Sequence, residues 1–303
     1  MTPELRHLRY LLAVAEHGSF TRAAEELRVS QPTLSQQVRQ LERAVGAQLL
    51  DRTARRVRLT DAGETYAHHA RRALRDLAAA ERAVRDVRDL ARGHLRLAVT
   101  PTFTAYLVGP LVAELHDRHP GITANVREMP QDRIESALLA DDVDLGIAFA
   151  GVHLPGVGAA TLFTETLSLV TGARATEDDL PRPLPVGHLA ELQLALLSGD
   201  FATRGHIDAH FAAHRVQPRI AVEANSVQAL VEIVRRTPVA TVLPDAITHD
   251  HPRLTPVPLE PALPARTVTL LRRDGGYETA AARAFTLLAH DLVRARGYTG
   301  ARP

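Results

Sequence analysis

Apolar residues at helical spacing predict three short amphipathic helices at the start of the chain. The first is marked by Leu5, Leu8, Leu12 and Ala15. The other two lie in residues 18–46, GSFTRAAEELRVSQPTLSQQVRQLERAVG, and are joined by the tight polar turn RVS. The pattern therefore indicates a three-helix unit that contains a helix–turn–helix.

Capping residues set the expected limits of the second and third helices. The second begins at Ser19 or Thr21, whose hydroxyls can accept hydrogen bonds from free backbone N–H groups. Ser30 caps the third helix, and Pro32 occupies its first turn, where a missing N–H costs little. Gly46 is placed to end that helix in a left-handed conformation. The expected buried faces comprise Phe20, Ala23, Ala24 and Leu27 in one helix and Leu34, Val38, Leu41 and Val45 in the other.

The third helix keeps an unusually polar outer face. Gln, Thr, Ser and Arg side chains of this kind can hydrogen-bond to base edges when a helix enters the major groove. We therefore interpret it as a recognition helix for duplex DNA. An ordinary solvated helix pair is the alternative, because helix–turn–helix geometry alone is common. The residues left off the buried face are Gln31, Thr33, Ser35, Gln36, Arg39 and Arg43.

The next segment, LLDRTARRVRLT at residues 49–60, predicts a small β-hairpin. Two short apolar pieces flank a basic tip, and such a wing can place guanidinium groups on phosphates or in the minor groove. A solvated charge run is the alternative. The arginines of this segment are Arg52, Arg55, Arg56 and Arg58.

A long helix is expected from Thr60 or Asp61, one of which caps it, to about Arg92, where Arg92-Gly93-His94 resembles a hinge. Its apolar residues alternate spacings of four and three over nearly four heptads, which favours pairing with a second copy of the chain. Packing on the chain's own C-terminal domain is the alternative. The residues of this seam are Tyr66, Ala70, Ala73, Leu77, Ala80, Val84, Val87 and Ala91.

From residue 95 onward the pattern changes to alternating strands and helices, which implies parallel α/β sheets. The chain is long for one sheet, and a Pro-rich piece at 181–185 lies within its second part, so two lobes are expected. The predicted strands are Leu95–Thr100, Ile122–Met129, Val143–Phe149, Leu167–Val170, Leu194–Ser198, Ile220–Glu223, Val239–Leu243 and Thr267–Leu271. The predicted helices are Thr102–Arg118, Arg133–Ala140, Thr203–Arg215, Ser226–Arg236 and Tyr277–Arg296.

Two strand–helix junctions are candidates for a ligand site. Ligands of such folds bind outside the carboxyl ends of strands, near helix N-termini, and AVTPTFT at 98–104 and LSGDFAT at 197–203 place hydroxyls there. Hydroxyls and free N–H groups of this kind can hold a small anion. Simple helix capping is the alternative explanation for Ser and Thr at these places.

Composition and charge favour a cytoplasmic nucleic-acid-binding protein. The 303-residue chain contains no cysteine, so thiol catalysis and cysteine-ligated metals are excluded. No signal peptide or transmembrane stretch is apparent, and no membrane partner is expected. Residues 1–92 hold 17 Arg against 12 Asp and Glu, a formal charge of +5, whereas the remainder carries −4. The basic part thus contains the predicted helix–turn–helix.

With these elements in order, the whole chain resembles a LysR-type transcriptional regulator, most specifically in FTRAAEELRVSQPTLSQQVRQLERAVGAQLLDRTARRVRLTDAGE. The resemblance implies an N-terminal all-α winged helix–turn–helix, a linker helix that pairs antiparallel with that of another subunit, and a two-lobed α/β effector domain like type II periplasmic binding proteins. The implied DNA contacts are Gln31, Pro32, Thr33, Ser35, Gln36 and Arg39, with Arg55 and Arg56 from the wing. The implied effector contacts are Thr100, Thr102, Phe149, Ser198, Phe201 and Thr203.

The resemblance also implies how the chain is divided. We expect a DNA-binding domain at 1–60, a dimerisation helix at 61–92 and an effector domain at 93–303. In this fold the chain crosses between lobes twice, near 162–165 and 264–267 here. One lobe then spans about 95–163 plus 267–303, and the other about 164–266.

A narrower resemblance links the chain to regulators of bacterial cyanate-utilisation operons. The segments that carry it are VTPTFTAYLVGPL, DLGIAFA, LLSGDFATR, EANS, RRT and LLRR. Cyanate is a small linear anion, which suits a pocket of hydroxyls and amides. The expected partners are an imperfect palindromic operator in duplex DNA, a small-molecule effector, a dimer that joins into a homotetramer, and RNA polymerase, on which we expect an activator to act.

Two other classes of protein, an enzyme and a solute-binding protein, fit the sequence less well. No catalytic constellation has a spacing that stands out, so we expect no enzyme and no cofactor. His206, His210 and His214 form an i, i+4, i+8 stripe, but it lacks a carboxylate or a fourth ligand in register, which favours a helix surface over a metal site. A solute-binding protein without gene control is opposed by the absent signal peptide and the basic N-terminal unit.

Overall fold

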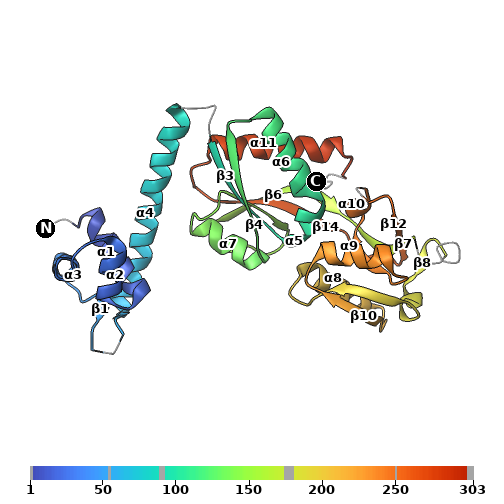
Figure 1. The fold of residues 1–303 in the computed structure, drawn as a ribbon, viewed down its shortest axis with the longest axis horizontal. Coiled ribbons are helices and arrows are strands. Elements are labelled where there is room, and N and C mark those ends of the chain that lie inside the picture. Colours follow the sequence, from blue (N-terminus) through green and yellow to red (C-terminus); the bar gives the residue numbers. More distant parts are fainter. Residues whose placement is uncertain (1–2, 54–55, 89–92, 174–180, 250, 299–303) are drawn as a thin grey trace. The chain divides into compact units, whose positions relative to one another are not determined.

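A computed structural model of the chain describes residues 3–53, 56–88, 93–173, 181–249 and 251–298 (Figure 1). The chain forms two compact units, 1–85 and 86–303.

The N-terminal unit begins with three helices whose limits follow their capping residues. They are α1 (Leu5–His17), α2 (Phe20–Leu27) and α3 (Gln31–Val45). Ser19 accepts a hydrogen bond from the backbone N–H of Arg22, and Ser30 accepts one from that of Thr33. Gly46 follows α3 with φ 75°, in the left-handed region that favours glycine. The predicted helix–turn–helix is therefore confirmed.

The predicted buried face of α3 is wrong at one residue, Val45. Leu34, Val38 and Leu41 are fully buried against α1 and α2, but Val45 is 37% exposed. Val45 lies in the last turn of α3, immediately before the left-handed Gly46, and the helix has left the core there.

A two-stranded hairpin follows α3. Strands β1 (Leu50–Asp51) and β2 (Arg58–Leu59) pair antiparallel, with Leu50 opposite Leu59. The long helix α4 (Asp61–Arg88) starts directly afterwards, and the Thr60 hydroxyl accepts a hydrogen bond from the N–H of Gly63 at 3.0 Å. A Cβ at Gly63 would lie 2.0 Å from the carbonyl oxygen of Leu49, so this glycine lets α4 pack closely on the hairpin.

Helix α4 carries the predicted apolar seam, and much of it is exposed. The seam residues Ala73, Leu77, Ala80 and Val84 are exposed, with Leu77 at 42% and Val84 at 58%, whereas Ala70 is buried. The helix is described as far as Arg88. The expected hinge residue Arg92 and the seam residue Ala91 lie outside the described residues, as does the side chain of Val87.

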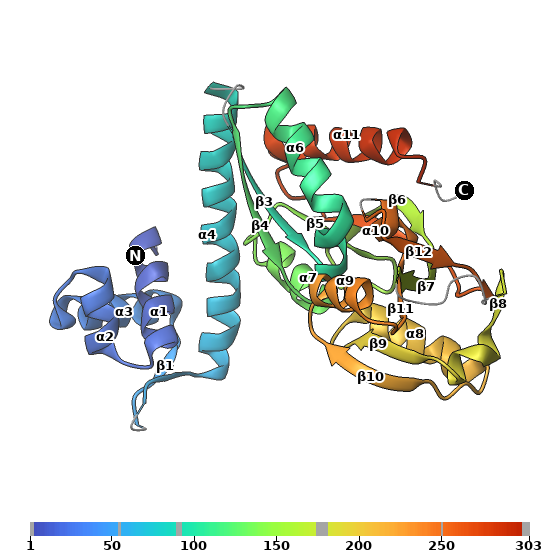
Figure 2. The ribbon, with the colours of Figure 1, turned by 45° about the vertical axis from the view of Figure 1, so that its right-hand side comes forward.

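The C-terminal unit contains a five-stranded sheet with strand order β4-β3-β5-β14-β6. Helices α6 and α11 cover one face and α7 the other (Figures 1 and 2). The strands are β3 (Gly93–Val99), β4 (Ile122–Glu128), β5 (Leu145–Phe149), β6 (Val157–Glu165) and β14 (Arg266–Arg273). The helices are α5 (Pro101–Phe103), the π-helical turn η1 (Thr104–Val108), α6 (Gly109–Arg118), α7 (Gln131–Leu139) and α11 (Ala280–Ala295). We call this group of elements lobe I.

The remaining elements, within residues 166–265, form lobe II. Its sheets have the strand orders β11-β7-β12, β10-β9 and β13-β8. The strands are β7 (Leu167–Gly172), β8 (Leu184–Pro185), β9 (Gln193–Leu197), β10 (Arg219–Ala224), β11 (Thr241–Pro244), β12 (Leu254–Val257) and β13 (Leu259–Glu260). The helices are the 3-10 turn η3 (Val186–Ala190), α8 (Ala202–Ala213), α9 (Val227–Arg236) and α10 (Asp245–His249).

The expectation of parallel sheets is correct for some strand pairs and wrong for others. Strand β3 pairs parallel with β4 and β5, and β9 pairs parallel with β10. Strand β14, however, runs antiparallel between β5 and β6, and β7 pairs antiparallel with β11 and β12. The chain returns to lobe I through β14, and β6, which the apolar pattern did not predict, is the edge strand beside it.

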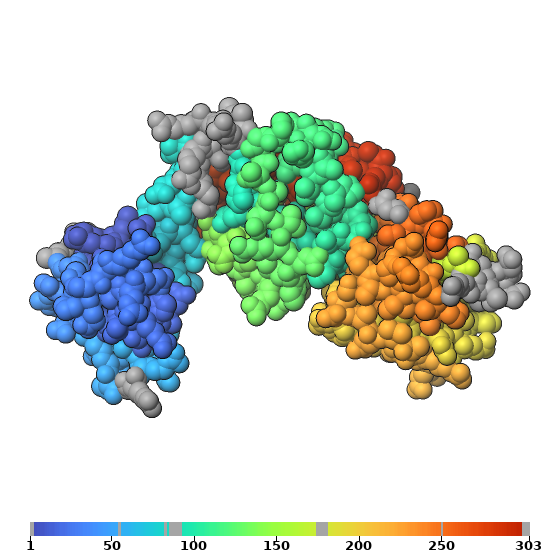
Figure 3. All heavy atoms as spheres, in the orientation of Figure 1, coloured from blue at the N-terminus to red at the C-terminus, as the bar shows by residue number. Residues whose placement is uncertain are grey.

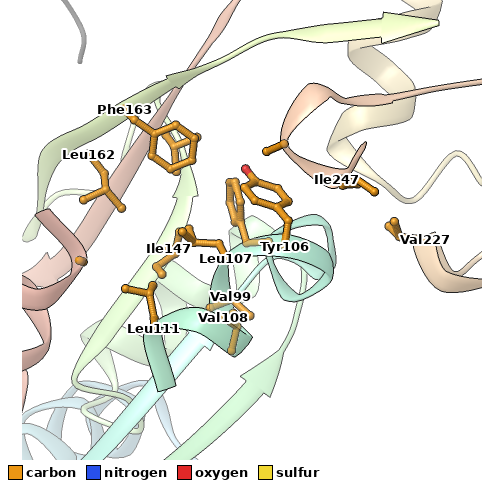
Figure 4. Packing of buried hydrophobic residues seen from close by; sticks show 14 of the residues in the cluster. Val99, Tyr106, Leu107, Val108, Leu111, Ile147, Leu162, Phe163, Val227 and Ile247 are labelled. Atoms are coloured by element: carbon orange, nitrogen blue, oxygen red, sulfur yellow. The ribbon is translucent and has the colours of Figure 1, made fainter. Parts of the chain in front are cut away.

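One continuous apolar core serves both lobes. It joins side chains of lobe I, including Tyr106 and Phe163, to Val227 and Ile247 of lobe II (Figure 4). The Tyr106 and Phe163 rings meet edge to face with centroids 6.5 Å apart. The lobes are thus packed together beneath the site described next.

Candidate DNA-binding and effector-binding sites

The outer face of α3 presents most of the predicted DNA contacts to solvent. Gln31, Pro32, Thr33, Gln36 and Arg39 are exposed. All of them except Thr33 border an open concavity of about 870 Å³ that continues along α3 to the start of the hairpin. Exposed amide and guanidinium groups on one helix face are the donors and acceptors that base edges and phosphates require.

Ser35 has a different role from its neighbours. Its side chain is buried, and its hydroxyl oxygen accepts a hydrogen bond of 3.2 Å from Nη2 of Arg39, one turn later. The contact holds the Arg39 side chain along the helix. Because the side chain is already ordered, it loses less conformational entropy when it binds DNA. Ser35 therefore supports Arg39 in the geometry of the unbound protein.

The hairpin is fixed to α3 by a residue that the sequence analysis did not single out. Oε1 of Glu42 accepts hydrogen bonds from the backbone N–H groups of Leu49 and Leu50 at 3.0 and 3.1 Å. Its other oxygen accepts one from Nη2 of Arg52 at 2.7 Å. The wing is thereby held in register with the recognition helix. Of the two predicted wing contacts, Arg56 is exposed and Arg55 lies outside the described residues.

A cavity of about 560 Å³ opens in the C-terminal unit where the carboxyl ends of five strands converge. In Figure 3 lobe I comprises the green and the red parts of that unit, and lobe II the yellow and orange parts. The cavity walls follow β3, β4 and β5 in lobe I and β9 and β10 in lobe II. They comprise Thr100, Pro101, Thr102, Glu128, Met129, Pro130, Gln131, Asp132, Phe149, Gly199, Asp200, Phe201, Ala202, Gly205 and Asn225. Both predicted junctions thus contribute to one cavity.

Four of the six predicted effector contacts line this cavity, namely Thr100, Thr102, Phe149 and Phe201. Ser198 and Thr203 are not among the lining residues. The Ser198 hydroxyl donates to a carboxylate oxygen of Asp200, and Thr203 is fully buried behind Thr102. The hydroxyl oxygens of Thr102 and Thr203 are 3.1 Å apart and share a hydrogen bond.

Sequence reasoning missed the wall formed by residues 128–132 and Asn225. The side chain of Gln131 fixes this wall to β5, because its amide donates to the carbonyl oxygen of Phe149 and accepts from the N–H of Phe149. The end of the predicted strand 122–129 could have indicated this wall. Ligands of this fold bind outside the carboxyl ends of strands, and that rule, which predicted the other two junctions, also applies to this strand.

A buried ionic network lies behind the cavity wall. The guanidinium of Arg266 stacks 3.9 Å from the centroid of the Phe149 ring, and its Nη1 donates to the Thr203 hydroxyl at 3.2 Å. Its Nη2 pairs with Glu165, which faces Arg266 across β6 and β14. The Tyr106 hydroxyl donates to the other Glu165 oxygen at 2.5 Å.

Burial controls the protonation of this network. Burial raises the pKa of Glu165 above its ordinary value, although Arg266 and the Tyr106 hydroxyl oppose that shift. Burial, followed by the nearby Glu165 charge, raises the pKa of Tyr106 well above 10. Tyr106 therefore remains a hydrogen-bond donor to Glu165 at neutral pH. The network connects the cavity wall to the two strands by which the chain crosses between lobes.

The histidine stripe on α8 is not the solvated helix face that we expected. His210 is buried, His206 is half-buried, and only His214 is exposed. The ring of His206 hydrogen-bonds to the Pro264 carbonyl oxygen at 2.8 Å. Among the described residues, no cluster of three or more His, Cys, Asp or Glu side chains has the arrangement of a metal site. Across the same residues, every helix is too short or too polar to cross a bilayer.

These features define a DNA-binding regulator with a separate ligand-binding domain, and the comparisons with known proteins agree. Residues 5–64 match the family described as "Bacterial regulatory helix-turn-helix protein, lysR family", and residues 88–293 match "LysR substrate binding domain". The chain belongs to the LysR family of DNA-binding transcriptional regulators. Members of this family are not enzymes, in agreement with the expectation from sequence.

Individual relatives cover 80% of the chain or more. The uncharacterized HTH-type transcriptional regulator YfeR of Shigella flexneri is 30% identical over 98% of this chain and 95% of its own. The nitrogen assimilation regulatory protein nac of Klebsiella aerogenes is 31% identical over 80% of this chain and 78% of its own. These relatives lend no support to the narrower resemblance to cyanate-operon regulators.

Solved structures share the fold. A full-length OxyR variant from Pseudomonas aeruginosa has a TM-score of 0.68 at 24% identity, and the match covers 100% of both chains. CbnR complexed with its target DNA has a TM-score of 0.63 at 22% identity, covering 95% of this chain and 99% of CbnR. The likeness confirms the predicted fold class, an N-terminal helix–turn–helix domain with a long helix and a C-terminal α/β domain.

Proposed function

We propose that this protein reads an imperfect palindrome in duplex DNA through α3 and the wing, and that an effector bound in the 560 Å³ cavity controls its activity. The observation that carries the first part is the exposed polar face of α3, braced to the wing by Glu42. Gln36 and Arg39 are the proposed base contacts, and Arg55 and Arg56 the proposed wing contacts.

The cavity supports the second part. Its volume lies in the ordinary range for small-molecule sites, and its walls combine aromatic rings with a few polar groups. Thr100, Thr102, Phe149 and Phe201 are the proposed effector contacts, while Ser198 and Thr203 act from behind the wall through their hydrogen bonds to Asp200 and Thr102.

The exposed seam of α4 supports self-association. A 28-residue helix is about 42 Å long, and its exposed Leu77 and Val84 are the residues that a second α4 would cover. We propose a dimer through this helix, and a tetramer of two dimers that acts on RNA polymerase. The proposed domain limits remain 1–60, 61–92 and 93–303.

The control step requires an effector with unequal affinity for two conformations. We propose that filling the cavity changes how lobe I and lobe II close on each other, and that this alters the geometry of the two dimers and the bending of the bound DNA. Base contacts by α3 are unchanged in this scheme. A thermal-shift titration of the full chain and of Thr102→Val tests the cavity assignment. A ligand that stabilises both proteins equally would place the effector elsewhere.

A further inference from the structure

The wall of the cavity carries an unbalanced negative charge. Glu128, Asp132 and Asp200 line it, and none of the described lining residues is Arg, Lys or His. No ion pair is formed by any of these three carboxylates within the described parts of the chain. Arg266, a buried cation behind the wall, stacks on Phe149 and is paired with Glu165, so the two contribute no net charge.

Helix N-termini offset only part of this charge. Two helices of adequate length, α7 and α8, begin at the cavity. Each N-terminus is equivalent to roughly half a positive charge, which gives about +1 against three carboxylates. An anion in the cavity therefore meets a net repulsive field, whereas a cation is attracted.

A buried polar group lies within the wall of the cavity. Thr100 is only 4% exposed and lines the cavity, and its hydroxyl oxygen, shielded from solvent, has no hydrogen-bond partner among the described residues. An unsatisfied buried hydroxyl is costly, and a donor that reaches it as the wall adjusts around a ligand would satisfy its oxygen. This observation is independent of the carboxylates and also points to a bound polar ligand.

Aromatic rings and size complete the description. Phe149 and Phe201 both line the cavity, and aromatic faces attract organic cations as well as apolar groups. Cyanate has three heavy atoms. Since one water molecule occupies about 30 Å³ of liquid, such an ion would leave most of the 560 Å³ empty.

We infer that the effector is an organic cation, a molecule with an amine or guanidine group and an apolar portion, and not a small anion. In this arrangement the cationic nitrogen lies against Glu128 and Asp132, and the apolar portion contacts Phe149 and Phe201. The inference rests on the proposed function, because it assigns a chemical class to the effector of the same cavity.

The test is a thermal-shift and calorimetric titration of the full chain with matched pairs of opposite charge. Phenethylamine is compared with phenylacetate, and putrescine with succinate, at constant ionic strength, with cyanate as a further anion. We expect saturable stabilisation by at least one amine and none by its matched acid. Glu128→Gln and Asp132→Asn are each expected to weaken amine binding about two- to fivefold. The matched control is Asp117→Asn, an exposed carboxylate on α6, which is expected to leave amine binding unchanged.

Saturable binding of an anion, or no stabilisation by either amine, overturns the inference. Amine binding that is insensitive to both cavity substitutions overturns it as well. Failure of the proposed function is detected separately, since it appears as the absence of sequence-selective duplex binding, which these titrations do not measure.

Discussion

The hydroxyls of Thr102 and Thr203, 101 residues apart in the chain, share a hydrogen bond of 3.1 Å at the cavity wall. Thr102 belongs to lobe I and Thr203 to lobe II. Thr203 also accepts from Arg266, which is paired with Glu165 on the other crossing strand. Two hydrogen bonds, from Thr102 to Thr203 and from Thr203 to Arg266, thus connect a ligand beside Thr102 to β14, one of the strands that join the lobes.

Thr102→Val is expected to weaken the effector response while leaving DNA affinity unchanged. The substitution keeps the shape of the side chain but removes its hydrogen bond to Thr203, and no part of the DNA-binding surface is altered. The measurement pairs a promoter–reporter response with a gel-shift titration. Equal loss in both assays would contradict the division of labour between the two units.

Glu165→Gln is expected to lower the free energy of unfolding by about 3–5 kcal/mol, because it leaves the Arg266 guanidinium buried without its counter-charge. Replacing both partners in Glu165→Leu/Arg266→Met is expected to cost much less. Denaturant unfolding measures both. The exposed Glu232, which pairs with Arg235 and Arg236, provides the control, and Glu232→Gln should have no resolvable effect.

His210 is expected to make the protein sensitive to mild acid. Burial, and then the neighbouring His214, lower its pKa below the ordinary 6.5. The unfolded chain therefore takes up a proton at higher pH than the folded chain does. The stabilising contribution is complete above pH 6.5 and is lost as the pH falls through the lowered pKa.

His210→Leu should flatten this dependence, as seen in melting temperatures measured from neutral pH downward. His116→Gln, a substitution at an exposed histidine of α6, serves as the control and should keep the wild-type slope. An unchanged slope in His210→Leu would mean that other groups carry the acid sensitivity.

Leu77→Glu is expected to weaken self-association at least about a hundredfold, because each copy would bury an unpaired carboxylate in the α4 interface. Analytical ultracentrifugation measures the change. Arg72→Glu introduces the same side chain on the opposite side of the helix by heptad spacing and should preserve the assembly. If both variants stay associated, the seam does not form the dimer.

Local chemistry explains why the N-terminal unit was largely predictable. The caps at Ser19, Ser30, Thr60 and Gly46 bond to residues only three or four positions away in the chain. The local sequence is therefore enough to predict them. Strand β6 differs, because its middle consists of small exposed residues without regular alternation. Strand β6 forms because it pairs antiparallel with β14, which lies about 100 residues later in the chain. The local sequence of β6 gives no sign of that pairing.

In the candidate effector site, too, the features determined locally were predicted and those that depend on distant segments were not. Thr100 was found because it lies at a hydroxyl-bearing strand–helix junction, and Phe149 because the family resemblance implied it. Glu128 and Asp132 were missed because that loop has no hydroxyl pattern. The pairing of Arg266 with Glu165 depends on the register of two distant strands. The sign of the cavity charge, and with it the expected effector class, emerged only when these segments were brought together.

Selection of duplexes from a random DNA library tests the central claim most directly. The full chain is predicted to enrich an imperfect palindrome with half-sites spaced by whole helical turns. Gln36→Ala and Arg39→Ala are predicted to bind the enriched site more weakly by about 1–3 kcal/mol each, while Arg253→Ala, at an exposed arginine of the C-terminal unit, binds it normally. No enriched sequence, or an unchanged sequence and affinity in both α3 variants, would contradict the account.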